Sequence, residues 1–223
     1  MVSATGPAMG RFPTVLVTGF EPFGGEAVNP SWMAAQALHG REIAKHRVIA
    51  ARLPTVFDRS LDVLRELLLC HRPRLVICAG QAGGRTALSL ERVAINVNDA
   101  RIRDNAGAQP IDTPVAADGP AAYFSSLPIK AMLLALTDAG IRAEVSQTAG
   151  TFVCNHVFYG LMHELAARPE LHDTRGGFIH VPWLPGQGQP SMPLDEIVEG
   201  LRLAIACALT NEHDIRKEAG ALS

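Results

Sequence analysis

The order of apolar and polar residues along the chain predicts alternating strands and helices. Consecutive apolar residues at 75–79 are typical of a strand covered on both faces, so we place this strand centrally in a sheet. Residues 157–165 instead repeat apolar side chains at the three- and four-residue spacing of a buried helix face. The complete prediction has strands at 14–18, 47–53, 75–79, 91–99, 141–148 and 177–182, and helices at 30–38, 57–69, 128–139, from 154 onward and at 194–209.

Local signals and chain length then set the organisation. Asn29 followed by Pro30 predicts an N-cap and a first helical position. A chain of 223 residues with 48% hydrophobic content has the size of one α/β domain with a substantial core. We therefore expect a flexible N-terminal extension at 1–13, a single domain at 14–210 and a charged C-terminal tail at 211–223 that frays.

Charge and cysteine content narrow the classes of partner. A formal net charge of −2 without a clustered basic stripe gives no electrostatic reason to expect nucleic acid or an acidic membrane surface. No apolar run reaches the length of a membrane span, and the opening residues lack the hydrophobic core of a signal peptide. The cysteines at 70, 78, 154 and 207 form no CxxC pair, which argues against a disulfide framework or a zinc site. We expect a cytoplasmic protein without a metal or other cofactor.

Glycine-rich turns follow two of the predicted strands, at 19–25 and 80–85. Open α/β sheets place their sites where such turns leave the carboxyl ends of parallel strands. A nucleotide-binding enzyme would use these turns for phosphate, but both the G-x-G-x-x-G fingerprint and a phosphate-loop lysine are missing from the sequence. Phe20 and Phe23 predict a small apolar pocket in the first turn, although both rings could instead fold back into the core. The polar, irregular segment at 101–119 is long enough to be a lid or an oligomer contact.

Cys154 lies where a predicted strand, a tight turn and a helix start meet. A thiol in the first turn of a helix feels the positive end of the helix dipole, which favours the thiolate. The unpaired backbone N–H groups at the same place could receive an oxyanion. The alternative is that Cys154 is a small buried hydrophobe, as most intracellular cysteines are. Catalysis by this thiol would need a base and a third group that orients the base.

His180 is the best candidate for the base, because it lies near the end of an apolar strand. A lone histidine on a strand is also often a core residue. Glu91 follows the second glycine turn and is the candidate third group, with a surface carboxylate at a strand start as the alternative. His156 shares the helix of Cys154 but points to another side, which predicts a capping or packing role. Surface or element-end positions are predicted for the histidines at 39, 46, 71, 172 and 213.

Six short blocks of the sequence form a set. They are GFEPFGG at 19–25, GQAGGR at 80–85, ERVAIN at 91–96, DARI at 99–102, GTFVCNH at 150–156 and FIHVP at 178–182. In this order and at these spacings, the chain resembles the pyroglutamyl peptidase I (pyrrolidone carboxyl peptidase) family of cysteine peptidases from about residue 14 to residue 209. The resemblance implies a single-domain, three-layer α/β/α sandwich around a mixed, mostly parallel, twisted sheet.

The resemblance also implies a site and a reaction. Its catalytic residues would be Glu91, Cys154 and His180, acting as a Cys-His-Glu triad. Members of the family remove an N-terminal pyroglutamyl residue from peptides and release 5-oxoproline. The substrate-binding residues implied by the matching blocks are Phe20, Phe23, Gln81 and Arg101.

The family implies partners as well. Its members act on peptides with an N-terminal pyroglutamate and often form homotetramers, so a homo-oligomer is expected here. Trp183 departs from the pattern, because the family has a smaller aromatic residue after the FIHVP block. The competing hypothesis is a catalytically silent small-molecule-binding protein of the same fold, in which Cys154 would be a core residue.

Overall fold

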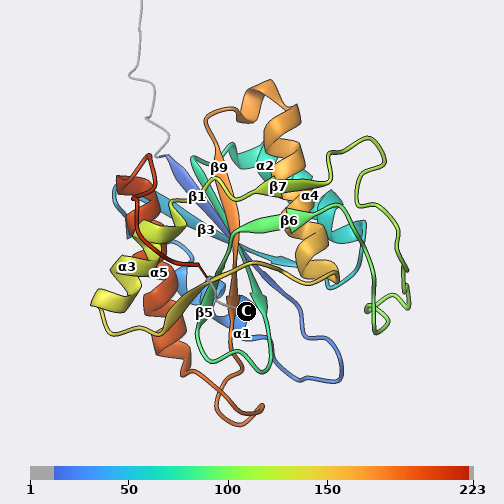
Figure 1. The fold of residues 1–223 in the computed structure, drawn as a ribbon, viewed down its shortest axis with the longest axis horizontal. Helices are drawn as coiled ribbons and strands as arrows, with labels where there is room; N and C mark the ends of the chain where they lie inside the picture. The colour runs from blue at the N-terminus through green and yellow to red at the C-terminus, as the bar shows by residue number, and fades with distance from the viewer. Residues whose placement is uncertain (1–12, 221–223) are drawn as a thin grey trace, which may run out of the picture.

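The computed structural model describes residues 13–220, so the predicted extension at 1–13 lies outside the described residues except for Pro13. Strands and helices alternate along most of the described chain (Figure 1). The strands are β1 (Thr14–Phe20), β2 (Glu42–Ile43), β3 (His46–Leu53), β4 (Leu75–Gln81), β5 (Leu88–Glu91), β6 (Val93–Ile95), β7 (Ala122–Phe124), β8 (Ala143–Ser146) and β9 (Arg175–Val181). The helices are α1 (Pro30–Leu38), α2 (Arg59–His71), α3 (Ile129–Asp138), α4 (Val153–Ala167), the short 3-10 helix η1 (Pro169–Leu171) and α5 (Leu194–Thr210).

The main sheet has the strand order β2-β3-β1-β4-β9-β5-β8. Its pairs β1–β3, β1–β4, β4–β9 and β5–β8 are parallel. The pairs β2–β3 and β5–β9 are antiparallel. The sheet is therefore mixed and mostly parallel, as predicted. The central position predicted for residues 75–79 is also confirmed, since β4 lies between β1 and β9 and all its residues are buried.

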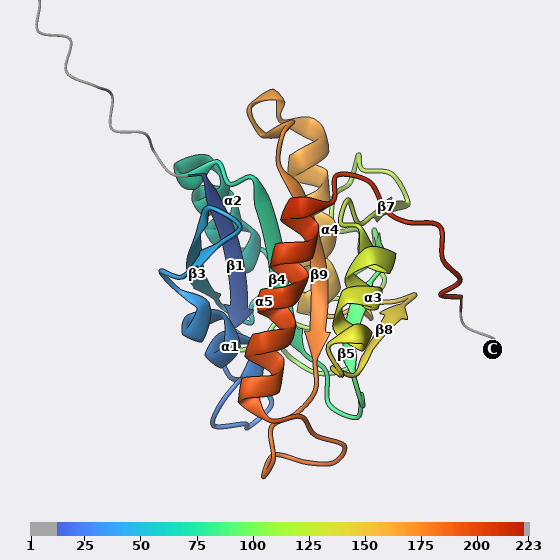
Figure 2. The same cartoon turned by 90° about the vertical axis from the view of Figure 1, so that its left-hand side faces the viewer.

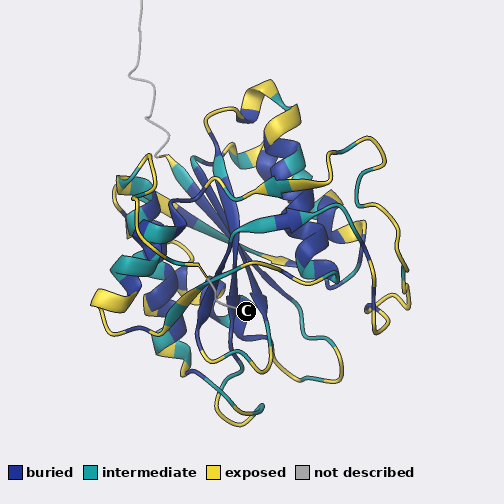
Figure 3. Cartoon of the chain, viewed as in Figure 1, coloured by how far each residue is buried: buried dark blue, intermediate teal, exposed yellow. Residues whose placement is uncertain are grey.

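Helices cover both faces of the sheet and complete the predicted three layers. One apolar cluster joins the sheet to α1, α3 and α5. A second cluster joins the opposite face to α2 and α4. Figure 2 shows the first group of helices lying in front of the strands and α2 and α4 behind them. The strands between them are buried on both faces (Figure 3). In the part of the chain that the structure describes, no helix is both long and apolar enough to cross a membrane.

The start of α1 confirms the predicted cap and fixes the first glycine turn. The Oδ1 atom of Asn29 accepts a hydrogen bond from the Ser31 N–H at 3.1 Å, and Pro30 is the first helical residue. The Ser31 hydroxyl in turn accepts a hydrogen bond from the Phe20 N–H at 3.0 Å. The Asn29 amide also donates to the Glu21 carbonyl at 3.1 Å. The cap of the helix thus also holds the loop that follows β1.

The predicted strand at 91–99 is wrong in its extent. β5 already ends at Glu91, and the short strand β6 pairs with β7 outside the main sheet. Beyond this end, the Asn155 side chain accepts a hydrogen bond from the Ile95 N–H at 3.0 Å and donates to the carbonyls of Ile95 and Val97. These bonds occupy backbone groups that a longer sheet strand would use. Glu91 therefore ends a strand instead of beginning one.

The described part of the C-terminal tail, residues 211–220, makes a contact that the sequence did not predict. The Asp214 carboxylate accepts hydrogen bonds from the backbone N–H groups of Lys130 and Ala131, at 3.1 Å and 2.9 Å. These are orphan donors of the first turn of α3, where a carboxylate also complements the helix dipole. Residues around Asp214 are therefore held against α3. The sequence did not predict this contact, because Asp214 and the start of α3 lie far apart along the chain.

The irregular segment at 101–119 is anchored at its base. The buried Asp104 carboxylate accepts hydrogen bonds from the N–H groups of Phe57, Ala106 and Ala108. Beyond this anchor, most residues of the segment are exposed. The segment projects from the rest of the molecule in Figures 1 and 3. Both expectations for it, a lid or an oligomer contact, stay predictions.

Candidate active site

Cys154 lies in the first turn of α4, as the sequence predicts. The turn before it needs the left-handed backbone of Gly150, with a φ of 76°. Two hydrogen bonds join this turn to the segment after β6: the Asp99 N–H donates to the Thr151 carbonyl at 2.9 Å, and the Thr151 hydroxyl donates to the Asp99 carbonyl at 2.7 Å. Among the described residues, no side chain caps the helix. Its first N–H groups therefore have neither an intrahelical partner nor a capping side chain.

The thiol lies over the carboxyl end of the sheet. A Cβ atom added to Gly80 would lie 2.8 Å from the Cys154 Sγ and 2.7 Å from the Phe178 ring. Gly80 is the neighbour of His180 in the parallel pairing of β4 with β9. The missing side chain at Gly80 thus makes room for the sulfur beside the strand that carries the histidine.

His180 and Glu91 form a buried pair. The His180 Nδ1 lies 2.7 Å from the Glu91 Oε1. The side chains are 4% and 0% exposed. Because a carboxylate can only accept, Nδ1 carries the ring proton and Nε2 is left free to take another. The structure thus brings the three predicted catalytic residues to one end of the sheet, from β5, α4 and β9.

Burial and the nearby charges act on the pKa values of both His180 and Cys154. Burial lowers the pKa of His180, while the hydrogen bond and the charge of Glu91 oppose this effect. Burial and then the charge of Glu91 raise the pKa of Cys154 to about 12, with Arg85 opposing. Burial of the sulfur therefore opposes the thiolate that the helix start is expected to favour.

A pocket of about 300 Å³ opens beside the start of α4. Two predicted substrate-binding residues, Phe23 and Arg101, line it. Gln81 is buried at the end of β4, where its Oε1 lies 3.4 Å from the Gln187 Nε2. Phe20 is only 2% exposed and packs into the core, 6.3 Å from the Phe178 ring centroid. For Phe20, the ring thus folds back into the core, which was the alternative given above. Its role in binding substrate stays a prediction.

Two residues of the site were missed by the sequence reasoning. The Phe152 ring lines the same pocket and packs 6.1 Å from Phe23 and 5.4 Å from Phe57, measured between ring centroids. Its position directly before the helix that carries Cys154 could have identified Phe152 as a site residue from the sequence. Arg85 was counted only as the end of a glycine turn, but its Nη1 donates to the Glu91 Oε1 at 2.9 Å.

His156 has the packing role predicted for it. Its Nε2 accepts a hydrogen bond from the Asp58 N–H at 3.1 Å, and its Nδ1 lies 2.9 Å from the Asn98 Oδ1. Both ring nitrogens are therefore occupied within the scaffold, and the residue is 1% exposed. A second base beside Cys154 is not supplied by this ring.

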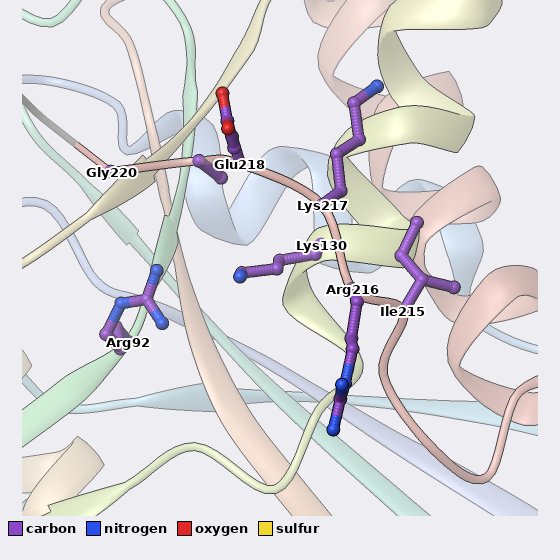
Figure 4. Close-up of a pocket in the computed structure, with 8 residues that line it drawn as sticks. Arg92, Lys130, Ile215, Arg216, Lys217, Glu218 and Gly220 are labelled. Atoms are coloured by element: carbon purple, nitrogen blue, oxygen red, sulfur yellow. The ribbon is translucent and has the colours of Figure 1, made fainter.

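A larger hollow, of about 840 Å³, lies away from the triad. Figure 4 shows Arg92 on one side, Lys130 of α3 on another, and the C-terminal tail from Ile215 to Gly220 across it. No triad residue lines this hollow. Within residues 13–220, no cluster of three or more His, Cys, Asp or Glu side chains could hold a metal ion.

A cysteine at the same end of the sheet as a histidine whose Nδ1 is fixed by a buried carboxylate supplies the residue types of a thiol hydrolase. The α/β sheet places that arrangement at its carboxyl end, where such folds carry their sites. Chemistry of this class acts on an acyl group through a covalent thioester.

Comparison with known proteins narrows this class to a family. Residues 13–211 match the family described as Pyroglutamyl peptidase. The chain is 59% identical to the pyrrolidone-carboxylate peptidase of Cupriavidus taiwanensis over 215 residues, which cover 94% of this chain and 99% of that protein. The corresponding protein of Bacillus thuringiensis is 55% identical, over 93% of this chain and 98% of its own length.

Solved structures agree with this assignment. The crystal structure of pyroglutamyl peptidase I from Bacillus amyloliquefaciens superposes with a TM-score of 0.90 at 48% identity, covering 93% of this chain and 100% of that one. A pyrrolidone carboxyl peptidase variant from Pyrococcus furiosus gives a TM-score of 0.84 at 41% identity, covering 88% of this chain and 98% of that one. The chain belongs to the pyroglutamyl peptidase family.

Proposed function

We propose that this chain is a cysteine peptidase that removes an N-terminal pyroglutamyl residue from peptides, with Cys154 as nucleophile, His180 as base and Glu91 as the group that orients the base. One observation carries the assignment of roles: the 2.7 Å contact between the His180 Nδ1 and the buried Glu91 carboxylate, which directs Nε2 away from Glu91. Family membership supports the substrate class.

Acylation would begin from the neutral pair. The His180 Nε2 takes the thiol proton while the Cys154 sulfur attacks the pyroglutamyl carbonyl carbon. The carbonyl electrons move to oxygen, which the N–H groups at the start of α4 stabilise. When the tetrahedral intermediate collapses, the peptide C–N bond breaks and the imidazolium gives its proton to the leaving amine. Glu91 stabilises the transient imidazolium without taking its proton.

Deacylation repeats these steps with water. His180 takes a proton from the water that attacks the thioester carbonyl, and the C–S bond breaks when the second intermediate collapses. The sulfur leaves and recovers a proton from the imidazolium. The products are 5-oxoproline and the free enzyme, so protons and electrons balance over the two steps without a cofactor.

The pocket beside α4 suits the pyroglutamyl ring. Pyroglutamate lacks a free α-amine, so its subsite needs apolar walls and a few hydrogen-bond partners instead of a carboxylate. The rings of Phe23 and Phe152 supply such walls. Proline lacks the ring carbonyl, and a polar group left unpaired in such a slot costs about 1–3 kcal/mol. Prolyl substrates should therefore be poor ones.

The first test is release of a chromogenic amine from a pyroglutamyl anilide, with a prolyl anilide beside it. The unmodified protein should turn over only the first substrate. Cys154→Ser should keep its fold but lose activity by at least about 10³-fold, because the hydroxyl is a weaker nucleophile in this setting. Cys70→Ser is the matched control, since Cys70 is an exposed thiol on α2 and should leave turnover unchanged.

Two outcomes would contradict the proposal. Unchanged turnover by Cys154→Ser would exclude Cys154 as the nucleophile. No turnover of the pyroglutamyl anilide by folded, reduced protein would favour the catalytically silent small-molecule-binding protein instead.

Two further features belong to the same proposal. We infer a homo-oligomer, by family resemblance a homotetramer, supported by exposed apolar side chains such as Phe124 and Ile111, which are 70% and 67% exposed. A cytoplasmic location is supported by the cysteines at 70, 78, 154 and 207, all of which are free thiols.

A further inference from the structure

Arg85 connects two parts of the proposed site. It lies in the turn between β4 and β5, and its side chain is 24% exposed. One guanidinium nitrogen, Nη1, donates to the Glu91 Oε1 at 2.9 Å. The other, Nη2, donates to the Thr148 carbonyl at 3.0 Å. Thr148 belongs to the loop that leads from β8 to α4, so the same side chain contacts both the triad carboxylate and the approach to Cys154.

Both bonds to Glu91 converge on one oxygen. His180 Nδ1 and Arg85 Nη1 lie 2.7 Å and 2.9 Å from Oε1, whereas the buried Oε2 has no hydrogen-bond partner among the described residues. A fully buried carboxylate is costly unless a cation compensates it. If Arg85 were absent, that cation would have to be the His180 ring itself. A ring held permanently as imidazolium could not take the Cys154 proton.

The charged groups that act on His180 are therefore opposed in sign. Glu91 of β5 favours the charged ring, while Arg85 of the turn disfavours it. The third titratable neighbour, the Cys154 thiol of α4, lies at the same end of the sheet. The turn that carries Arg85 is itself fixed, because the Trp183 ring packs against Gly83 so closely that an added Cβ would lie 2.1 Å from the ring.

We propose that Arg85 is a positioning residue of the peptidase: it shares the Glu91 carboxylate with His180 so that the ring rests as a neutral base, and it holds the loop that precedes Cys154. This role rests on the proposed function. Arg85 acts through Glu91 and Thr148 and does not contact the reacting atoms.

The test compares three variants by the pH dependence of kcat/KM for the pyroglutamyl anilide. Arg85→Met should lower kcat about 10- to 100-fold with little change in KM, because loss of general-base function carries such factors. The acidic limb of kcat/KM should move upward by about one pH unit, since removal of the positive charge favours the protonated ring. Arg85→Lys should restore most of this shift. The matched control is Arg92→Met, because Arg92 donates to the exposed Gln147 and should leave the profile unchanged.

A double-mutant cycle keeps the test valid if Arg85→Met folds poorly. In the Glu91→Gln background no buried charge needs compensation and only the Thr148 contact is lost, so Arg85→Met should there lower kcat clearly less than in the unmodified background. An equal loss in both backgrounds would show that Arg85 does not act through Glu91. An acidic limb that stays in place in Arg85→Met would equally overturn the proposal.

The pKa of His180, followed by NMR in the protein without substrate, separates this proposal from the proposed function. A pKa that does not rise in Arg85→Met would overturn the role of Arg85 even if the protein is an active peptidase. A raised pKa in a protein that cannot cleave the pyroglutamyl anilide would support the coupling of Arg85 to His180 and overturn the peptidase assignment.

Discussion

His156 lies two positions after Cys154, yet its chemistry serves the scaffold. Its ring receives the Asp58 N–H at the start of α2 and contacts Asn98 on the other side. Its edge also packs on Phe57, with ring centroids 5.3 Å apart. Since Nε2 accepts a hydrogen bond, only a neutral ring fits this environment. Burial accordingly lowers the pKa of His156 from 6.5 to about 4.

This shift predicts a pH-dependent stability. The unfolded chain takes up a proton on His156 below about pH 6.5, but the folded ring does so only near pH 4. The stability from this group is therefore complete above pH 6.5 and falls as the pH drops toward 4. Between pH 7 and pH 5 the loss should be about 2 kcal/mol, at about 1.4 kcal/mol for each pKa unit. Urea unfolding at the two pH values measures it.

The matched variants are His156→Gln and His172→Gln. His156→Gln should be less stable at pH 7 but should lose about 2 kcal/mol less than the unmodified protein on going to pH 5. The exposed His172 is a control whose replacement should leave the pH dependence unchanged. An identical pH dependence in His156→Gln would show that another group is responsible.

Helices α2 and α4 pack closely against each other at Gly160, which has no side chain. A Cβ atom added to Gly160 of α4 would lie 2.2 Å from the Leu61 Cδ2 of α2. Leu61 and the apolar face of α4 belong to one buried cluster beneath the sheet. The close packing of the two helices matters for the site, because α4 carries Cys154 on its first turn.

Gly160→Ala tests this contact. An alanine gains about 0.5–1 kcal/mol of helix stability over glycine, but overpacking of a full core typically costs about 1–3 kcal/mol. The cost of overpacking should exceed the gain in helix stability, so the free energy of unfolding measured in urea should fall. Leu61→Ala alone should cost about 2–5 kcal/mol by opening a cavity. In the double variant the new methyl group enters that space, so the total loss should be smaller than the sum; strictly additive losses would contradict this packing.

Whether the sequence could predict an element depended on where its hydrogen-bond partners lie. The α1 start was predictable because Asn29, Pro30 and Ser31 form the cap within a few residues. The extent of the strand at 91–99 was not, because Asn155 takes its backbone bonds from 60 residues away. Elements with local partners were thus found, and elements ended by a distant side chain were misjudged.

At the scale of the whole molecule, the exposed Phe124 on β7 is a test of assembly. If the homo-oligomer buries this ring, Phe124→Glu should lower the mass of the particle in solution, because a charge placed in an apolar contact is costly. Light scattering after size-exclusion chromatography measures the mass. Leu69→Glu, on the outer face of α2 and 41% exposed, is the control and should leave the mass unchanged. An unmodified protein that runs as a monomer, or an unchanged mass for Phe124→Glu, would contradict the proposed contact.

At the candidate site, the local structure around each residue was predictable from the sequence, whereas the contacts between the residues were harder to predict. The local sequence around Cys154 and His180 predicted a helix start and a strand end, and both are confirmed. His180 and Glu91, which are 89 residues apart, were candidates from their positions in the sequence, each with a structural alternative, and only the family resemblance joined them with Cys154 in one site. Arg85 was overlooked for a different reason: Glu91 is only six residues away, but the sequence did not show that the Arg85 side chain folds back from its turn onto this carboxylate.

Gly80 contributes to the site by having no side chain. Any larger residue there would compete with the Cys154 sulfur and the Phe178 ring for the same space. A sequence that keeps the cysteine, the histidine and the glutamate can therefore still lack room for them. When relatives of this chain are sorted into active and inactive enzymes, the glycine that faces the sulfur should be considered together with the three proposed catalytic side chains.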